Sequence, residues 1–287
     1  MKFVHAVNTI AKLTNIFNGS SSPVHNNEFI MIEFDLRSRV NNNGGLEVVI
    51  AHDLGDIINS VTLEEWLAVL INLSGDKWVD FHLYFGLKFD FKCIQIVELT
   101  LKSLFVLLPT QTFTSDKIWL NADILVGPGV VDDTHSTPLL ASAFIPLCLH
   151  YCPTCVLSLG WTTGPLLHTP SSSTSHSHTP PPIHTYTSDM IDEMLNLCDT
   201  YNLIHVTFPI RHCYVSSSWE QLQRLLLKSG GYTLTIWANR NDAPVPFSDP
   251  ATQITTVYDS SSTYASVDPV LVEYKDRIYY DIDDAIS

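Results

Sequence analysis

The stretch FIMIEFDLR, residues 29–37, decides how this chain of 287 residues folds. Its apolar residues run almost without a break, as is typical of a strand that is buried on both faces in a parallel sheet. Glu33 and Asp35 interrupt the run near its end. Side chains alternate between the two faces of a strand, so these acids share one face, with Cα atoms about 6.6 Å apart. The stretch therefore predicts a core strand that delivers two carboxylates to one place.

Similar apolar runs recur along the chain and alternate with helix-like segments. The strand candidates are KFVHAV (2–7), FIMIEFD (29–35), LEVVIAH (46–52), LKFDF (87–91), KIWLNADI (117–124), CVLSLGW (155–161), IHVTFPI (204–210), YTLTIWA (232–238) and RIYYDI (277–282). The helix candidates are residues 60–73, 93–108, 188–202 and 217–230. This alternation predicts a (β/α)8 TIM barrel that forms one domain over residues 1–287. Nine candidates for eight places mean that one run lies outside the barrel.

Two segments interrupt the alternation of strands and helices. The composition and the apolar runs bear on binding partners and on location. Residues 165–187 are a low-complexity insertion rich in Ser, Thr, Pro and His, and residues 241–269 form a second long loop. The net charge of −15 disfavours binding to nucleic acid. No run of residues is long and apolar enough for a transmembrane segment, and we expect a cytoplasmic protein because the N-terminus shows no signal peptide.

The six cysteines do not indicate a disulfide scaffold in a chain of this length. The CPTC motif at 152–155 has the spacing of a redox pair, but it precedes a strand instead of opening a helix. We therefore expect this pair to be incidental.

Polar residues stand at the ends of nearly all of the strand candidates. In a TIM barrel the active site gathers at the carboxyl ends of the strands, so these residues are the candidate site. They are His5, Asn8, Glu33, Asp35, His52, Asp90, Lys92, Asn121, Arg211 and Trp237.

Three of these residues, Glu33, Asp35 and Asp90, are carboxylates that would repel one another in a confined barrel mouth. A divalent cation among them would relieve the repulsion, and ligation by oxygen alone points to Mg2+ or Ca2+. The alternative is an ion-pair network with Arg37, Lys88 or Lys92, and the carboxylates alone do not decide between the two.

Two histidines at strand ends, His5 and His52, favour the metal site, because such a pair suits general acid and base catalysis. Arg211 either meets a phosphate or pairs with a barrel acid.

Two sets of motifs resemble known families. HAVN (5–8), EFD (33–35), AHD (51–53) and KFDFK (88–92) resemble the glycerophosphodiester-phosphodiesterase superfamily, which includes the spider-venom phospholipases D. TLEEWL, WLNADILVGP, LSLGWTTG, VTFPIR, LTIWA and IYYDI resemble the menorin family, a branch of the same fold. The resemblance runs from His5 to Asp281 and omits only the two irregular segments.

The resemblance implies a TIM barrel of the PLC-like phosphodiesterase type. By position, Glu33, Asp35 and Asp90 would hold the cation, and His5 and His52 would be base and acid. Lys92 would contact the phosphate and Trp237 would form an apolar wall, while Asn8 and Asn121 would make polar contacts. The phosphodiesterases usually carry Glu at the position of Asp90, whereas the venom enzymes carry Asp.

These implications leave three hypotheses about function. The first is a metal-dependent phosphodiesterase that acts on a glycerophosphodiester or a lysophospholipid. The second is a non-catalytic menorin with protein partners in cell-surface or neuronal, dendrite-branching complexes; it would be extracellular by family resemblance if the N-terminus is incomplete. The third is a carbohydrate-active barrel that pairs Glu33 with Asp90, and it gives the two histidines no role.

Overall fold

One nine-stranded sheet organises the fold, with its main path in the order β1-β2-β4-β5-β6-β7-β8-β11. A computed structural model describes residues 1–18, 29–74, 83–107, 115–130, 137–164, 184–238, 247–248, 255–256 and 274–281. Its main-path strands are β1 (Lys2–Val4), β2 (Ile30–Val40), β4 (Phe85–Phe91), β5 (Ile118–Val126), β6 (Val156–Thr162), β7 (Val206–Arg211), β8 (Tyr232–Trp237) and β11 (Ile278–Asp281). The pairs β1/β2, β2/β4, β4/β5, β6/β7 and β8/β11 are parallel.

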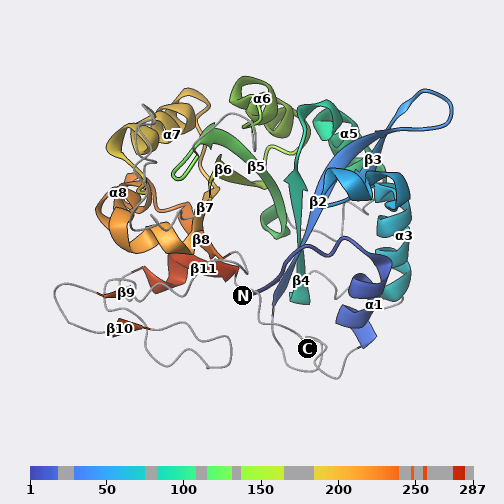
Figure 1. The fold of residues 1–287 in the computed structure, drawn as a ribbon, viewed down its shortest axis with the longest axis horizontal. Coiled ribbons are helices and arrows are strands. Elements are labelled where there is room, and N and C mark those ends of the chain that lie inside the picture. The colour runs from blue at the N-terminus through green and yellow to red at the C-terminus, as the bar shows by residue number, and fades with distance from the viewer. Residues whose placement is uncertain are drawn as a thin grey trace, which may run out of the picture. The chain divides into compact units, whose positions relative to one another are not determined.

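Helices alternate with these strands (Figure 1). The α-helices are α1 (Ile10–Asn18), α3 (Leu63–Ser74), α5 (Val97–Leu107), α6 (Ala141–Tyr151), α7 (Ser188–Thr200) and α8 (Val215–Lys228). The strand order and the alternation with helices are those of a (β/α)8 TIM barrel, so the predicted fold class is confirmed. Among the described residues, none of the helices combines the length and the apolar character that a membrane span requires.

The run LEVVIAH is the candidate that lies outside the barrel. It forms β3 (Leu46–Ile50), which pairs with β2 alone and runs antiparallel to it, so a parallel barrel strand is wrong for this run. The reason is the tight turn at residues 41–45, in which Gly44 adopts a φ of 79° and donates its N–H to Asn41 O. The chain therefore turns back along β2 instead of crossing over through a helix.

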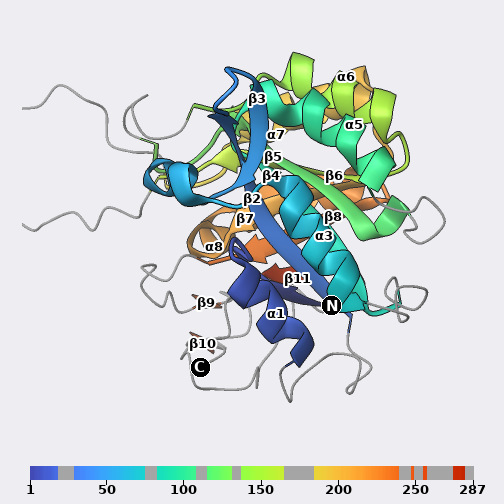
Figure 2. The same ribbon diagram turned by 90° about the vertical axis from the view of Figure 1, so that its right-hand side faces the viewer.

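The alternation within β2 and β4 separates an apolar face from a polar one. Phe34 of β2 packs against Phe89 of β4 and against Trp66 of α3, with ring centroids 4.8 and 4.3 Å apart. Figure 2 shows α3 beside β2. Residues such as Glu33 and Asp35 alternate with Phe34 and therefore point to the opposite face, away from this helix.

The start of α3 is set by a capping box. Thr62 Oγ1 accepts a hydrogen bond from Glu65 N, and Thr62 N donates to Glu65 Oε2, at 3.2 and 2.9 Å. The cap and the helix that follows it lie within the predicted helical segment 60–73. α7 is capped in a related way, because Thr187 accepts from Met190 N.

Helix α6 is absent from the predicted helices. Its sequence, ASAFIPLCLHY, is apolar nearly throughout, so it lacks the amphipathic pattern of a surface helix. It also carries Pro146 in its interior, a position from which proline is usually excluded in helices. The short helix α1 was missed as well, because nine residues give little periodicity.

The chain divides into two compact units. The first comprises Met1–Ala122, Leu139–Leu159 and His205–Thr207, and the second Asp123–Pro138, Gly160–Ile204 and Phe208–Ser287. In the second unit Trp161 packs against Tyr186 and Phe208, and Arg277 donates to the carbonyl oxygens of Leu226, Ser229 and Tyr232. Most of the predicted insertion at 165–187 and most of the loop at 241–269 lie outside the described residues, so the single-domain organisation stays a prediction.

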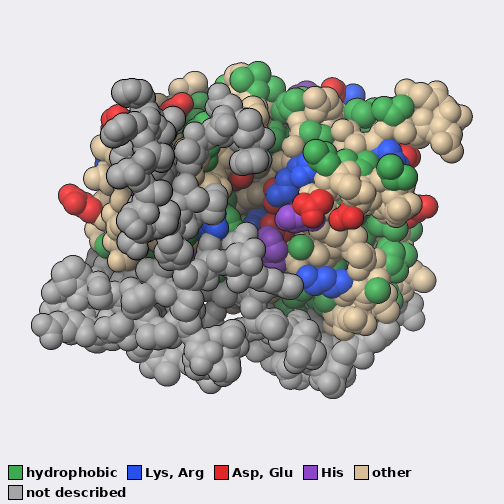
Figure 3. Space-filling model, in the orientation of Figure 1, with side chains coloured by type: hydrophobic (Ala, Val, Ile, Leu, Met, Phe, Trp, Pro, Cys, Tyr) green, Lys and Arg blue, Asp and Glu red, His purple; other side chains and the backbone are tan. Residues whose placement is uncertain are grey.

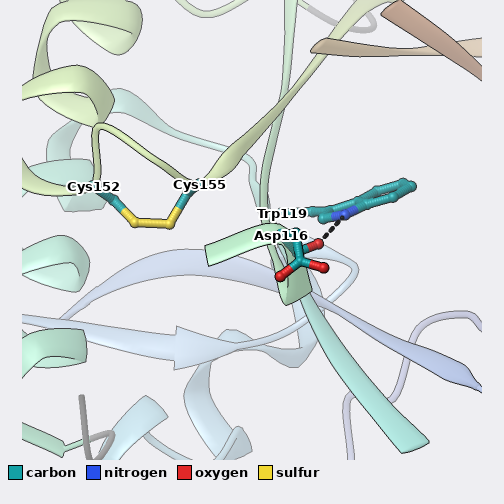
Figure 4. The surroundings of a disulfide bond; sticks show 4 residues. All are labelled: Asp116, Trp119, Cys152 and Cys155. Carbon is teal, nitrogen blue, oxygen red and sulfur yellow. Dashed lines mark hydrogen bonds between the residues drawn. A yellow bond between two sulfur atoms is a disulfide. The ribbon is translucent and has the colours of Figure 1, made fainter. Parts of the chain in front are cut away.

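Cys152 and Cys155 are joined in a disulfide bond (Figure 4), so the expectation that this pair is incidental does not hold in the structure. The bond closes the turn between the end of α6 and the start of β6, where Cys155 N donates to Cys152 O. Cys93, Cys148, Cys198 and Cys213 carry thiols. The turn brings the two sulfurs together because residues three apart in a turn lie close in space.

Thiol titration tests this assignment. Unfolded, unreduced protein is expected to give four thiols, and reduced protein six. In the native state Cys93, which is half-buried, should react first with iodoacetamide near pH 8. Burial raises the pKa of the Cys198 thiol to about 11 and also raises the pKa of Cys148, so few of these thiols are ionised at that pH. Their alkylation should accelerate as the pH rises, and six thiols before reduction would contradict the bond.

Candidate functional site

The candidate site is built on β2, β4 and β5 of the first unit. The strand register places Glu33 opposite Lys88, Asp35 opposite Asp90, and Asp90 opposite Asn121. Because neighbouring parallel strands present paired residues on the same face, three adjacent strands deliver Asp35, Asp90 and Asn121 side by side. All of these side chains are buried.

Lys92 lies between the two aspartates. Its Nζ is 2.5 Å from Asp90 Oδ2 and 3.0 Å from Asp35 Oδ1. Lys92 directly follows β4, and its N–H donates to Leu36 O of β2, which holds its backbone beside the carboxylates. One ammonium therefore bridges two carboxylates.

Each of these aspartates is also held by an amide. Asn8 Nδ2 donates to Asp35 Oδ2 at 2.6 Å, and Asn8 Oδ1 accepts from Asp35 N at 3.0 Å. Asn121 Nδ2 donates to Asp90 Oδ1 at 2.8 Å, and Ser158 Oγ donates to Asn121 Oδ1. One oxygen of each carboxylate is thus fixed by an amide while the other faces Lys92.

Glu33 connects His5 to Lys88. Glu33 Oε2 lies 2.6 Å from His5 Nδ1 and 3.2 Å from Lys88 Nζ. An ionised carboxylate only accepts hydrogen bonds, so His5 donates from Nδ1, and Nε2 becomes the ring nitrogen that can exchange a proton with a substrate. The Lys88 side chain is only 4% exposed, which makes this a buried ion pair.

The residues after β1 place His5 and Asn8. Ala6 has a φ of 51°, so the chain leaves the strand direction there, and Val7 N then donates to Glu33 O. Trp66 Nε1 donates to Val7 O at 3.0 Å. The segment from His5 to Asn8 is therefore pinned to β2 on one side and to α3 on the other.

His52 reaches the same neighbourhood through the hairpin. Since β3 runs antiparallel to β2, its end returns to the level of Asp35, where Ala51 N donates to Asp35 O. The His52 side chain is 58% exposed and its Nδ1 lies 2.9 Å from Asp53 Oδ1. Arg37 donates to His52 O, so Arg37 supports this turn instead of joining the carboxylate network.

Arg211 and Trp237 belong to the second unit. The Arg211 guanidinium lies 5.4 Å from the centre of the Trp237 ring and Nη1 donates to Gly164 O. Tyr214 Oη donates to the same carbonyl oxygen. A phosphate contact by Arg211 and a substrate wall formed by Trp237 both stay predictions.

Two residues of this network, Lys88 and Ser158, are not among the site residues predicted from the sequence. Lys88 figures only as one of three possible counter-ions, and Ser158 does not figure at all. The signal for Lys88 is its spacing of two from Asp90, which puts it on the same face of β4. On the face of the molecule shown in Figure 3, histidine, acidic and basic side chains lie side by side.

Asp35 and Asp90 offer the oxygen ligands that the metal prediction needs, but among the described residues Glu33 does not join them in one close group of three ligands, and the metal site stays a prediction. Asp35 and Asp90 direct one oxygen each to a common cationic group, and their other oxygens are held by amides, as is usual for carboxylates that ligate a metal. Oxygen ligands alone suit Mg2+ or Ca2+ better than zinc. In this structure the position between the two aspartates is taken by the ammonium of Lys92.

The family follows from a match over residues 1–287. The sequence model of the menorin N-terminal domain matches residues 1–287. The chain belongs to the menorin family. This agrees with the six motifs from TLEEWL to IYYDI that resemble menorins.

Among curated proteins, this menorin is similar to Protein FAM151B of Homo sapiens. The two are 32% identical over 212 residues, which cover 74% of this chain and 66% of the human protein. The chain thus spans slightly less than two thirds of that relative's length.

Proposed function

We propose that this menorin is a divalent-metal-dependent phosphodiesterase that acts on a glycerophosphodiester or a lysophospholipid. The observation that carries the proposal is the convergence of Asp35 and Asp90 on one cationic position, in the same network of strands as a histidine whose Nδ1 is held by Glu33. A cation site and an oriented imidazole together suit the cleavage of a phosphodiester.

Glu33, Asp35 and Asp90 would hold the ion. A bound Mg2+ or Ca2+ would neutralise the phosphate and draw charge from its oxygens. Asn8 and Asn121 would keep the aspartates oriented, because their amides are already engaged with Asp35 and Asp90. We therefore assign these two amides to positioning and not to direct contact with the substrate.

The two histidines would move the protons. His5 Nε2 would take a proton from the attacking water or substrate hydroxyl as its oxygen bonds to phosphorus, and Glu33 would stabilise the imidazolium that results. His52 would give a proton to the leaving oxygen as the second phosphorus–oxygen bond breaks. Lys92 would contact the phosphate, and Arg211 and Trp237 would contribute a second phosphate contact and an apolar wall.

Calorimetry tests the metal site. Wild-type protein is expected to bind Mg2+ or Ca2+, and Asp35→Ala should abolish the binding because it removes one of the converging oxygens. Asp53→Ala is the matched control, since this carboxylate is exposed and contacts only His52 among the interactions described. A panel of glycerophosphodiesters and lysophospholipids, with and without chelator, should then show turnover that depends on the ion. Failure of the wild type to bind either ion would overturn the site as drawn.

A non-catalytic menorin that binds protein partners in cell-surface or neuronal complexes is the second candidate. Two observations favour it. Lys88 and Lys92 already pair with the three buried carboxylates, so these ion pairs can have a structural role that does not depend on catalysis. The Cys152–Cys155 disulfide suits an oxidising compartment. Ion binding without turnover of any diester in the panel would favour this second function.

A further inference from the structure

The side chain of Lys92 satisfies two carboxylate oxygens that a metal ion would also need. Asp35 offers Oδ1 and Asp90 offers Oδ2, and Lys92 Nζ lies 3.0 and 2.5 Å from them. The remaining oxygens, Asp35 Oδ2 and Asp90 Oδ1, are occupied by Asn8 and Asn121. Asp35 Oδ1 and Asp90 Oδ2 are therefore the two oxygens without an amide donor among the described residues, and a cation that approaches them competes with Lys92.

The ammonium and a divalent ion cannot share this position. Ca2+ and Mg2+ bind oxygen at about 2.0–2.6 Å, so an ion on these two oxygens would place its charge next to that of the ammonium. Two like charges at such a distance repel strongly in a buried site. Binding of the ion and of the ammonium at these two oxygens is therefore expected to be competitive.

Lys92 has room to leave, whereas Lys88 does not. The Lys92 side chain is 28% exposed and its residue follows the end of β4, while the Lys88 side chain is 4% exposed and lies within the strand. The four-carbon stem of lysine is flexible and its ammonium is readily hydrated. The ammonium of Lys92 can therefore swing toward solvent without unfolding the strand.

We infer that the Lys92 ammonium is a built-in substitute for the divalent ion, held between Asp35 and Asp90 and displaced when the ion binds. This inference rests on the proposed metal site. It gives Lys92 two positions: in one its ammonium pairs with both aspartates, and in the other it can meet an anionic group of the substrate. The competition lowers the apparent affinity for the ion, because only the fraction of protein with Lys92 withdrawn is competent to bind.

Removing the ammonium should therefore tighten ion binding. Lys92→Met is expected to lower the Kd for Ca2+ or Mg2+ by about tenfold, as follows if Lys92 occupies the position about 90% of the time. Lys92→Arg keeps the charge and should stay close to the wild type. Lys102→Met is the matched control for net charge, since Lys102 pairs with Glu98 on α5. Calorimetric titration with each ion measures all four proteins, and circular dichroism checks their folding.

A second readout does not depend on affinity. Without an ion, Lys92→Met should unfold at a lower temperature than the wild type, because two carboxylates lose their shared cation. Saturating Ca2+ should then raise its unfolding temperature more than it raises that of the wild type. If Lys92→Met does not fold without an ion, Lys92→Gln replaces it, since its amide can still donate to one of the carboxylates.

The outcomes separate this inference from the proposed function. Tighter binding by Lys92→Met, with Lys92→Arg and Lys102→Met unchanged, supports the inference. Binding by the wild type with equal or weaker binding by Lys92→Met overturns the inference and leaves the metal site standing. Absence of binding in the wild type and in both Lys92 variants overturns the metal site, and the inference with it.

Discussion

Lys88→Met is expected to lower the free energy of unfolding by about 3 kcal/mol. Lys88 and Glu33 form a buried ion pair, and removal of one partner from such a pair usually costs about 3–5 kcal/mol because the other charge stays buried. We expect the low end of the range because His5 still donates to Glu33 Oε2. Urea unfolding followed by circular dichroism measures the change.

A second substitution separates the ion pair from simple packing. The double variant Glu33→Leu with Lys88→Met replaces both charges with apolar side chains, so most of the lost stability should return. Lys102→Met, which breaks an exposed pair with Glu98, should have no measurable effect. A double variant as unstable as Lys88→Met alone would show that the charge left on Glu33 is not the cause.

His52→Ala is expected to lower the turnover of a responsive phosphodiester by about 100- to 10,000-fold, the range for loss of a general acid or base. The fold should be unaffected, because the His52 side chain is 58% exposed and contacts Asp53, which is more exposed still. Steady-state kinetics with saturating metal, on the best substrate of the panel, would measure the loss.

Two controls accompany this variant. His150→Ala removes another exposed histidine, one that packs against Tyr151 on α6, and turnover should stay at the wild-type level. Imidazole added to His52→Ala should restore part of the activity, because an exposed site admits a small molecule whose protonated form can replace the lost acid. Unchanged turnover in His52→Ala would remove this residue from the mechanism.

The sequence alone predicts the part of the site that depends on alternation. Within FIMIEFDLR the period of two places Glu33 and Asp35 on one face and Phe34 on the other, and the structure packs Phe34 against α3. The capping box at Thr62 and Glu65 is equally local. Such features can be predicted because each depends on residues a few positions apart.

The pairing partners could not be predicted, since they depend on strand order and register. Arg37, Lys88 and Lys92 are equally plausible counter-ions until β4 is placed beside β2, which brings Lys88 opposite Glu33 and leaves Arg37 at His52 O. The direction of β3 could not be predicted either, because a short strand with four apolar residues out of five shows the same pattern whether it is parallel or antiparallel. The glycines of the turn before β3 are the sequence signal for a hairpin, and therefore for an antiparallel strand.

The register that sets Asp35 opposite Asp90 and Asp90 opposite Asn121 also limits how relatives of this chain can change in length. Insertion of one residue in β4 ahead of Asp90 would rotate the carboxylate to the helix-covered face and bring a phenylalanine to the polar one. Insertions between the strands leave the register intact. Divergence in length is therefore confined to the connections, while the strands that carry the acids can change only by substitution.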